Sequence, residues 1–240
     1  MPSSLLAQIR SAYPDPQSLP YYERLFSSGW DFDATVRAHL QDLARAIGCR
    51  GLREIQLARL DEFARGGKAD LADIEGLREA ILDELDAPGK KSHYEIRLML
   101  FDGMGLLQEE LECVEPTEES RKGTFMFREI FERGSLVEIT AAVGAIEEWY
   151  VPLAARLEAA YLGLGYSKRQ VSTYTLHKVA DIRHSNAALG FVCKYAEVSE
   201  APNVLEAVRK AFDSVIYYDR ARFVAAQSAG RSIGNTLRNV

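Results

Sequence analysis

Two of the four histidines in the chain bracket an aspartate in the segment "YTLHKVADIRHS", residues 174–185. On a helix, His177, Asp181 and His184 fall within about 60° of one another, on a stripe that continues through apolar residues. We therefore expect the three polar side chains to face the interior. A buried carboxylate and two buried imidazoles are costly unless they are hydrogen-bonded, paired or bound to a metal. The spacing predicts a metal site, and a buried polar network stays open as the alternative.

Two further ligand candidates precede this segment. Glu84 takes the next position on an apolar stripe in "IEGLREAILDEL", and His93 opens another helix after a short loop. The two side chains can meet across that loop while both face the core, although Asp83 or Asp86 could take the place of Glu84. His39 has no acidic partner at a suitable spacing, so we expect it to be structural.

A third carboxylate should come from a long helix at 135–163, where Glu138, Glu147 and Glu148 are the candidates. Glu147 borders a face of large apolar residues, whereas Glu148 lies on a face of small ones. Small side chains leave room for a metal and its substrate, which favours Glu148 and leaves Glu147 as its rival. Carboxylates and imidazoles together suit Fe(II) or Mn(II), whereas zinc and copper(I) sites use softer ligands.

Helical periodicity extends over almost the whole chain, and no segment alternates convincingly enough to predict a strand. The expected helices cover 19–28, 32–48, 51–65, 70–86, 92–107, 118–132, 135–163, 168–197 and 203–228. The breaks between them are rich in Gly, Pro and Ser, and no low-complexity linker divides the chain. The sequence thus predicts one all-α bundle of about seven to nine helices over residues 1–228, followed by a tail at 229–240.

Composition narrows the class of protein. The 240 residues are 47% hydrophobic and 27% charged, with a net charge of −6. No basic patch with interleaved aromatic residues predicts nucleic-acid binding, and the apolar runs are too short for a membrane span. No secretory signal opens the sequence. Cys49, Cys113 and Cys193 are far apart and form no CxxC pair, which is typical of reduced thiols in a cytoplasmic protein.

Together these segments resemble the haem-oxygenase-like non-haem di-iron oxidases and oxygenases, a superfamily of iron-containing redox enzymes. Its members show an acidic "DEL"-type helix end, a histidine soon after it, a "YExxVP"-type segment and then His-x3-Asp-x2-His. The corresponding segments here are "LDEL", "SHYEI", "EEWYVP" and "LHKVADIRHS". The chain has "EE" where the family has a tyrosine before its glutamate, so Glu147 stays a rival to Glu148. The resemblance implies a haem-oxygenase-like fold and this ligand set: Glu84, His93, Glu148, His177, Asp181 and His184.

The resemblance also implies two Fe(II) ions per chain, or Mn(II), with O2 as the co-substrate. Three carboxylates leave two divalent ions with a net positive charge, which favours an anionic ligand such as a substrate carboxylate. A basic residue is expected to receive that carboxylate, but the sequence does not single one out.

Family reactions include N-oxygenation, oxidative C–C cleavage and nitrile formation. We therefore expect a small amine or amino-acid substrate and a role in natural-product biosynthesis, with a homodimer as one option. The alternatives are a non-catalytic iron-binding helical protein and a metal-free, thiaminase-like hydrolase on the same scaffold.

Overall fold

The computed structural model describes residues 2–67, 69–85, 91 and 93–228, and the expected tail at 229–240 lies outside this range. Within it the chain forms helices and no strands, so the predicted all-α class is confirmed. The long helices are α1 (Pro2–Ser11), α3 (Phe32–Gly48), α4 (Leu52–Arg65), α5 (Leu71–Asp83), α8 (Glu118–Arg133), α9 (Leu136–Gly163), α10 (Ser172–Tyr195) and α11 (Ala201–Gln227). The shorter ones are α2 (Pro20–Phe26), α6 (His93–Leu98) and α7 (Gln108–Glu112), with 3-10 turns at Pro16–Ser18, Met99–Phe101 and Val198–Glu200.

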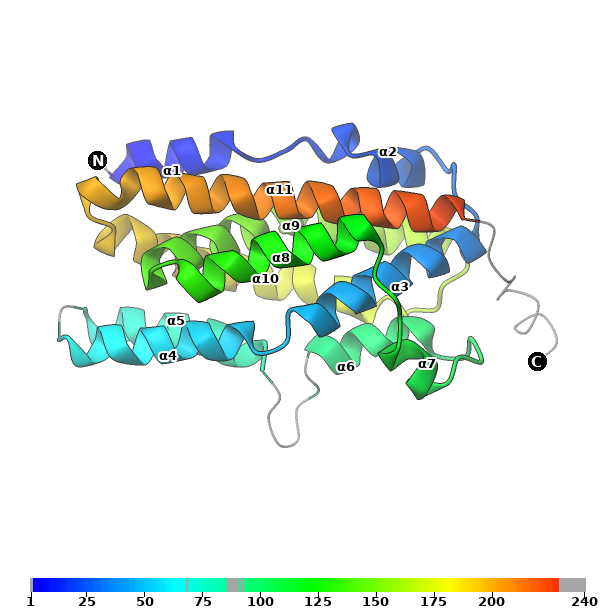
Figure 1. Ribbon diagram of the computed structural model, residues 1–240, viewed down its shortest axis with the longest axis horizontal. Coiled ribbons are helices and arrows are strands. Elements are labelled where there is room, and N and C mark those ends of the chain that lie inside the picture. Colours follow the sequence, from blue (N-terminus) through cyan, green and yellow to red (C-terminus); the bar gives the residue numbers. More distant parts are fainter. Residues whose placement is uncertain (1, 68, 86–90, 92, 229–240) are drawn as a thin grey trace.

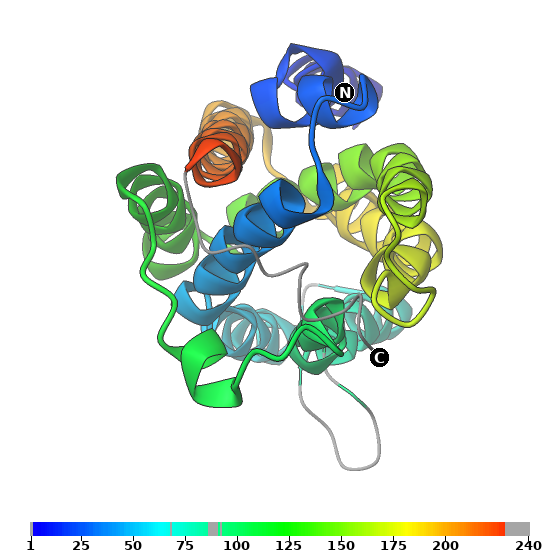
Figure 2. The ribbon, with the colours of Figure 1, turned by 90° about the vertical axis from the view of Figure 1, so that its right-hand side faces the viewer.

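The bundle is built around α9, α10 and α11. Helix α9 packs most extensively on α10, while α11 packs on α8, α3 and α9. In Figure 1, α1 and α2 cover one side of this group, and α4 and α5 lie along the opposite side. Seen along the bundle in Figure 2, α3 crosses it obliquely. Helix α5 also packs against α10.

Close packing of α9 on α10 depends on a glycine. A Cβ atom added at Gly144 would lie 2.7 Å from the Cβ of Ala188, which is far inside van der Waals contact. The face of small residues on α9 therefore lets α10 approach closely. This is the face that the sequence analysis expected to leave room for a metal.

Local signals explain where several helices begin. Asp31 caps α3 by accepting from the amide of Ala34 at 2.8 Å, and Thr117 caps α8 by accepting from the amide of Ser120 at 3.1 Å. Side-chain oxygens at these positions satisfy amides that have no partner inside the helix. The caps thus set the residues at which α3 and α8 begin.

The helix expected at 92–107 is shorter than predicted. Helix α6 ends at Leu98, and the 3-10 turn that follows ends at Phe101. Gly103 and Gly105 then adopt φ values of 77° and 67°, which lie in the left-handed region and break the helix. The sequence analysis predicted neither α1 nor α7. None of the described helices combines the length and the apolar character needed to cross a membrane.

Candidate metal centre

Two carboxylates and one imidazole from distant parts of the sequence meet in the interior. Glu84 follows the last residue of α5, Glu147 lies on α9 and His184 lies on α10. Each offers one ligand atom, and these atoms all lie within 4.8 Å of one another. Relative exposure is 0% for His184 and 9% for Glu147. We call Glu84, Glu147 and His184 the central cluster.

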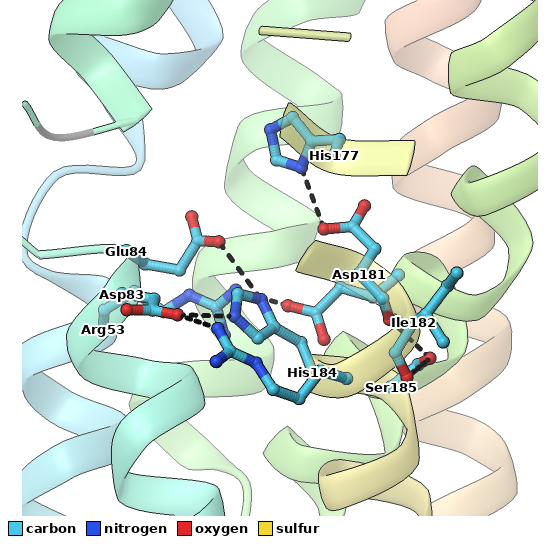
Figure 3. Close-up of polar contacts among 10 residues, drawn as sticks. Arg53, Asp83, Glu84, His177, Asp181, Ile182, His184 and Ser185 are labelled. Atoms are coloured by element: carbon cyan, nitrogen blue, oxygen red, sulfur yellow. Dashed lines mark hydrogen bonds and ion pairs between the residues drawn. The ribbon is translucent and has the colours of Figure 1, made fainter. Parts of the chain in front are cut away.

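The two ring nitrogens of His184 have different surroundings. Nε2 lies 3.1 Å from Oδ2 of Asp83, a hydrogen bond that is drawn in Figure 3. Nδ1 lies 3.8 Å from Oε1 of Glu84 and has no hydrogen-bond partner among the described residues. With the proton on Nε2, donated to Asp83, the lone pair of Nδ1 points toward the carboxylates. Asp83 therefore orients the ring and leaves Nδ1 as the atom that can bind a metal.

Asp181 and His177 extend the cluster along α10 (Figure 3). Nδ1 of His177 lies 2.9 Å from Oδ1 of Asp181, and Asp181 is only 2% exposed. Burial lowers the pKa of His177, but the hydrogen bond and the charge of Asp181 raise it by more, so the pKa ends above its ordinary value. The Oγ of Ser185 donates to the backbone oxygen of Asp181 at 2.6 Å, one turn further on. The stripe predicted from the sequence thus faces the interior as expected.

Glu147 forms an ion pair with an arginine in the interior. Its Oε1 lies 2.9 Å from Nη2 of Arg53, which comes from α4. Burial raises the pKa of Glu147 to about 8, Arg53 opposes that rise, and the charges of Asp181 and Glu84 add to it. The raised pKa thus reflects burial first and the negative charges of Asp181 and Glu84 second. A bound cation would stabilise the ionised carboxylate against both.

Glu148 points to a different part of the molecule. Its carboxylate accepts two hydrogen bonds from Arg10, at 2.6 and 3.0 Å, and one from the hydroxyl of Tyr13 at 2.7 Å. The Arg10 hydrogen bond holds the pKa of Glu148 below its usual range. The sequence-based preference for Glu148 over Glu147 is therefore not supported by this arrangement. The small-residue face of α9 packs closely against α10 at Gly144, and Glu148 reaches Arg10 on α1.

The remaining candidates have other positions. His93 is the first residue of α6, and its side chain lies outside the described residues. Glu138 is part of a capping box, in which it accepts from the amide of Ser135 at 3.4 Å. His39 is buried away from the central cluster, among tyrosine rings. The sequence analysis missed Arg53, since a single arginine in an amphipathic helix carries no signal of its own.

The side chains present fit a hard or borderline divalent cation. The central cluster offers two carboxylates and one imidazole nitrogen that has no hydrogen-bond partner, and Asp181 and His177 lie beside it. Mixed oxygen and nitrogen donors of this kind are typical of non-haem iron and manganese sites. Arg53 supplies a positive charge that stabilises the carboxylates when no cation is bound.

Comparisons with known proteins agree with this chemistry. A family model described as "iron-containing redox enzyme" matches residues 72–215, which include the central cluster and all of α10. A search of curated proteins gave no match. Among solved structures, a CADD-like protein of unknown function from Nostoc punctiforme matches with a TM-score of 0.65 and 14% identity, over 94% of this chain and 99% of that chain. At that identity the likeness shows the fold, which is the haem-oxygenase-like all-α fold expected from the sequence.

Proposed function

Because the chain belongs to the family of iron-containing redox enzymes, we propose that it is an O2-dependent non-haem di-iron oxidase or oxygenase. Its proposed substrate is a small amine or amino acid. The observation that carries the proposal is the central cluster, in which Glu84, Glu147 and His184 bring ligand atoms within 4.8 Å of one another. Two carboxylates and an imidazole in the interior of a redox family's fold are the parts of an iron site.

The proposed ligand set contains six residues, with Glu147 taking the place of Glu148. Asp181 and His177 join it because their hydrogen-bonded pair lies on the same stripe of α10 as His184. His93 joins it from the sequence pattern alone. Six protein ligands leave positions on two ions for O2 or a substrate. The set is Glu84, His93, Glu147, His177, Asp181 and His184.

The protein's own residues orient these ligands and exclude water. Asp83 fixes the His184 ring through Nε2, and Arg53 holds Glu147 in place. When bound, ferrous iron supplies electrons for the reduction of O2. The buried surroundings of His184 and Asp181 keep bulk water away from that chemistry.

Oxygen uptake tests the proposal. Protein loaded anaerobically with ferrous iron is mixed with O2 and a panel of amines and amino acids, each paired with the analogue that lacks the amine. We expect at least one amine to accelerate O2 uptake and to yield an oxidised product by mass spectrometry, while its deaminated analogue does neither. If the O2 consumed corresponds only to the ferrous iron oxidised, and no amine is converted to a product, the chain would instead be the non-catalytic iron-binding protein.

The hydrolase alternative depends on a thiolate nucleophile. Burial raises the pKa of Cys193, the cysteine nearest to the proposed ligands in sequence. A raised pKa keeps the thiol protonated at neutral pH and disfavours nucleophilic attack. Iron-dependent oxidation therefore remains the function that the site supports best.

A further inference from the structure

A charged arginine is buried among tyrosines in the core of the bundle. Arg222 on α11 is 2% exposed and donates to the hydroxyls of Tyr161 at 2.6 Å and Tyr22 at 3.0 Å. Its guanidinium also lies 4.1 Å from the centre of the Tyr21 ring. Among the described residues it forms no ion pair, and its Nε has no hydrogen-bond partner. A guanidinium stays protonated in proteins, so this is a buried charge with no anion in direct contact among the described residues.

The tyrosines around Arg222 do not supply that anion. Burial raises the pKa of Tyr21, Tyr22, Tyr161 and Tyr218 well above neutral pH, so all four are neutral phenols. They orient the guanidinium through hydrogen bonds and ring contacts, but as neutral groups they do not offset its positive charge.

The two nearest buried carboxyl groups are engaged elsewhere. Asp219 accepts from the backbone amides of Tyr21 at 3.1 Å and Tyr22 at 3.3 Å, at the start of α2. Oδ1 of Asp42 lies 3.6 Å from Nη1 of Arg97. The charge of Arg222 lowers the pKa of both carboxyls through space, but no hydrogen bond or ion pair joins Arg222 to either of them among the described residues.

His39 presents a second set of buried polar atoms without a hydrogen-bond partner, and it also contacts Tyr161. The His39 ring is 1% exposed, and its centre lies 4.6 Å from that of Tyr161. Neither ring nitrogen has a hydrogen-bond partner among the described residues. Burial and the charge of Arg222 lower the pKa of His39 to about 3, so the neutral ring carries one N–H donor. Buried polar groups in this state generally have a partner, which here would be a ligand or water.

One aromatic layer connects this region to the proposed iron site. The rings of Tyr161 and Tyr174 stack with centres 5.1 Å apart, and Tyr174 lies one turn before His177 on α10. The Tyr150 ring lies edge-on to His177, with centres 5.6 Å apart. The contacts thus run from Arg222 through Tyr161 to Tyr174, at the start of the stripe that carries His177.

We propose that Arg222 and His39 form a subsite that binds the carboxylate of an organic acid. The planar guanidinium and the imidazole N–H donate to the two carboxylate oxygens, and the acid neutralises the buried charge. This deepens the proposed function, on which its role in catalysis rests, by assigning the substrate a carboxylate and a position. Arg222 is a substrate-binding residue in this assignment, and it takes no part in holding iron.

Binding to metal-free protein tests the subsite apart from the iron chemistry. Two acid and alcohol pairs serve as probes in titration calorimetry with a chelator present: propanoate with propan-1-ol, and 3-phenylpropanoate with 3-phenylpropan-1-ol. We expect at least one acid to bind about tenfold more tightly than its alcohol, because a charge-assisted contact is lost in the alcohol. Failure of both acids to bind more tightly than their alcohols would overturn the proposal.

Variants locate the binding. Arg222→Gln should abolish the preference for the acid, Arg222→Lys should restore part of it, and His39→Phe should reduce it. Removal of a buried charge that lacks an ion partner need not destabilise the fold, which circular dichroism checks. The matched control is Arg156→Gln, which removes an exposed guanidinium 3.9 Å from the centre of the Phe26 ring. If Arg222→Gln does not fold, His39→Phe decides the outcome, and an unchanged preference there overturns the assignment.

Iron binding by the same variants separates the two proposals. Arg222→Gln should bind as much ferrous iron as the wild type, since no contact joins Arg222 to the proposed ligands in the part of the chain that the structure describes. A loss of acid binding with iron retained supports the subsite. Acid binding in a wild-type chain that takes up no iron would leave the subsite standing and remove the proposed function.

Discussion

Glu147 and Glu148 are adjacent in the chain, and their carboxylates meet different cations in different surroundings. Glu147 faces Arg53 and the central cluster, whereas Glu148 faces Arg10 and Tyr13 near the surface. Successive residues of a helix point about 100° apart, so one turn of α9 serves both the interior and the contact with α1. The difference makes the pair a direct test of the ligand assignment.

Glu147→Gln should lower the affinity for ferrous iron by about tenfold or more, because a ligand carboxylate becomes a neutral amide. Glu148→Gln should leave iron affinity unchanged and only weaken the contact with α1. Anaerobic equilibrium titration with ferrous iron measures both. Equal losses in the two variants would remove Glu147 from the proposed set.

His39 should make folding stability depend on pH. Its pKa is about 3 in the folded protein, below the ordinary value of 6.5, so the unfolded chain binds the proton first. This contribution to stability is complete above pH 6.5 and is lost as the pH falls toward 3. Burial lowers the pKa of His39 most, Arg222 and Arg97 lower it further, and Asp42 raises it.

Between pH 7.5 and 5.0 the wild type should therefore lose about 2 kcal/mol more unfolding free energy than His39→Phe. Urea unfolding at both pH values measures the difference. The comparison with the variant cancels the other titrating groups. Parallel losses in the two proteins would show that His39 is accessible to protons in the folded state.

At the scale of elements, periodicity predicted the helices that bury a regular stripe. Helix α10 is the clearest case, because Asp181 and His184 are buried on the stripe that the spacing indicated. The helix expected at 92–107 does not extend past Phe101, and Gly103 and Gly105 adopt left-handed conformations there that the helical periodicity did not indicate. The sequence left Glu147 and Glu148 as rival ligands for a tertiary reason. Which face of α9 receives α10 depends on partners that the local sequence does not specify.

Two helical glycines give a matched test of how closely α9 and α10 pack. Gly144→Ala should lower the unfolding free energy by about 1–3 kcal/mol, because the new methyl meets the Cβ of Ala188. Gly190→Ala should raise it by about 0.5–1 kcal/mol, because its added Cβ meets no atom within 4 Å and the helix gains rigidity. Urea unfolding of both variants is the measurement. A gain of stability in Gly144→Ala would mean that Gly144 lies further from Ala188 than the structure places it.

At the scale of the whole molecule, the central cluster joins the end of α5 to α9 and α10. The sequence predicted the all-α fold and most members of the cluster, since each lies on its own helical stripe. It gave no indication of Arg53, Arg222 or the tyrosines around His39, because their roles arise only where several helices meet. Charges that are buried through tertiary contacts leave no periodic signal.

A metal that joins three elements should stabilise the whole fold. At a free ferrous concentration about 100 times the dissociation constant, the unfolding free energy should rise by about 2.7 kcal/mol. For a chain of this size that corresponds to an increase in Tm of roughly 5–10 °C. Anaerobic differential scanning fluorimetry with and without a chelator measures it. His184→Ala should show no increase, and an equal increase in that variant would place the stabilising iron elsewhere.

The most direct measurement is the number of ferrous ions bound per chain, determined by anaerobic titration of the wild type and of His184→Ala. We predict two ions per wild-type chain and loss of tight binding in the variant, since Nδ1 of His184 is the ring nitrogen that faces the carboxylates without a hydrogen-bond partner. A wild-type chain that binds no iron, or a variant that binds as much as the wild type, would be incompatible with a metal centre at Glu84, Glu147 and His184.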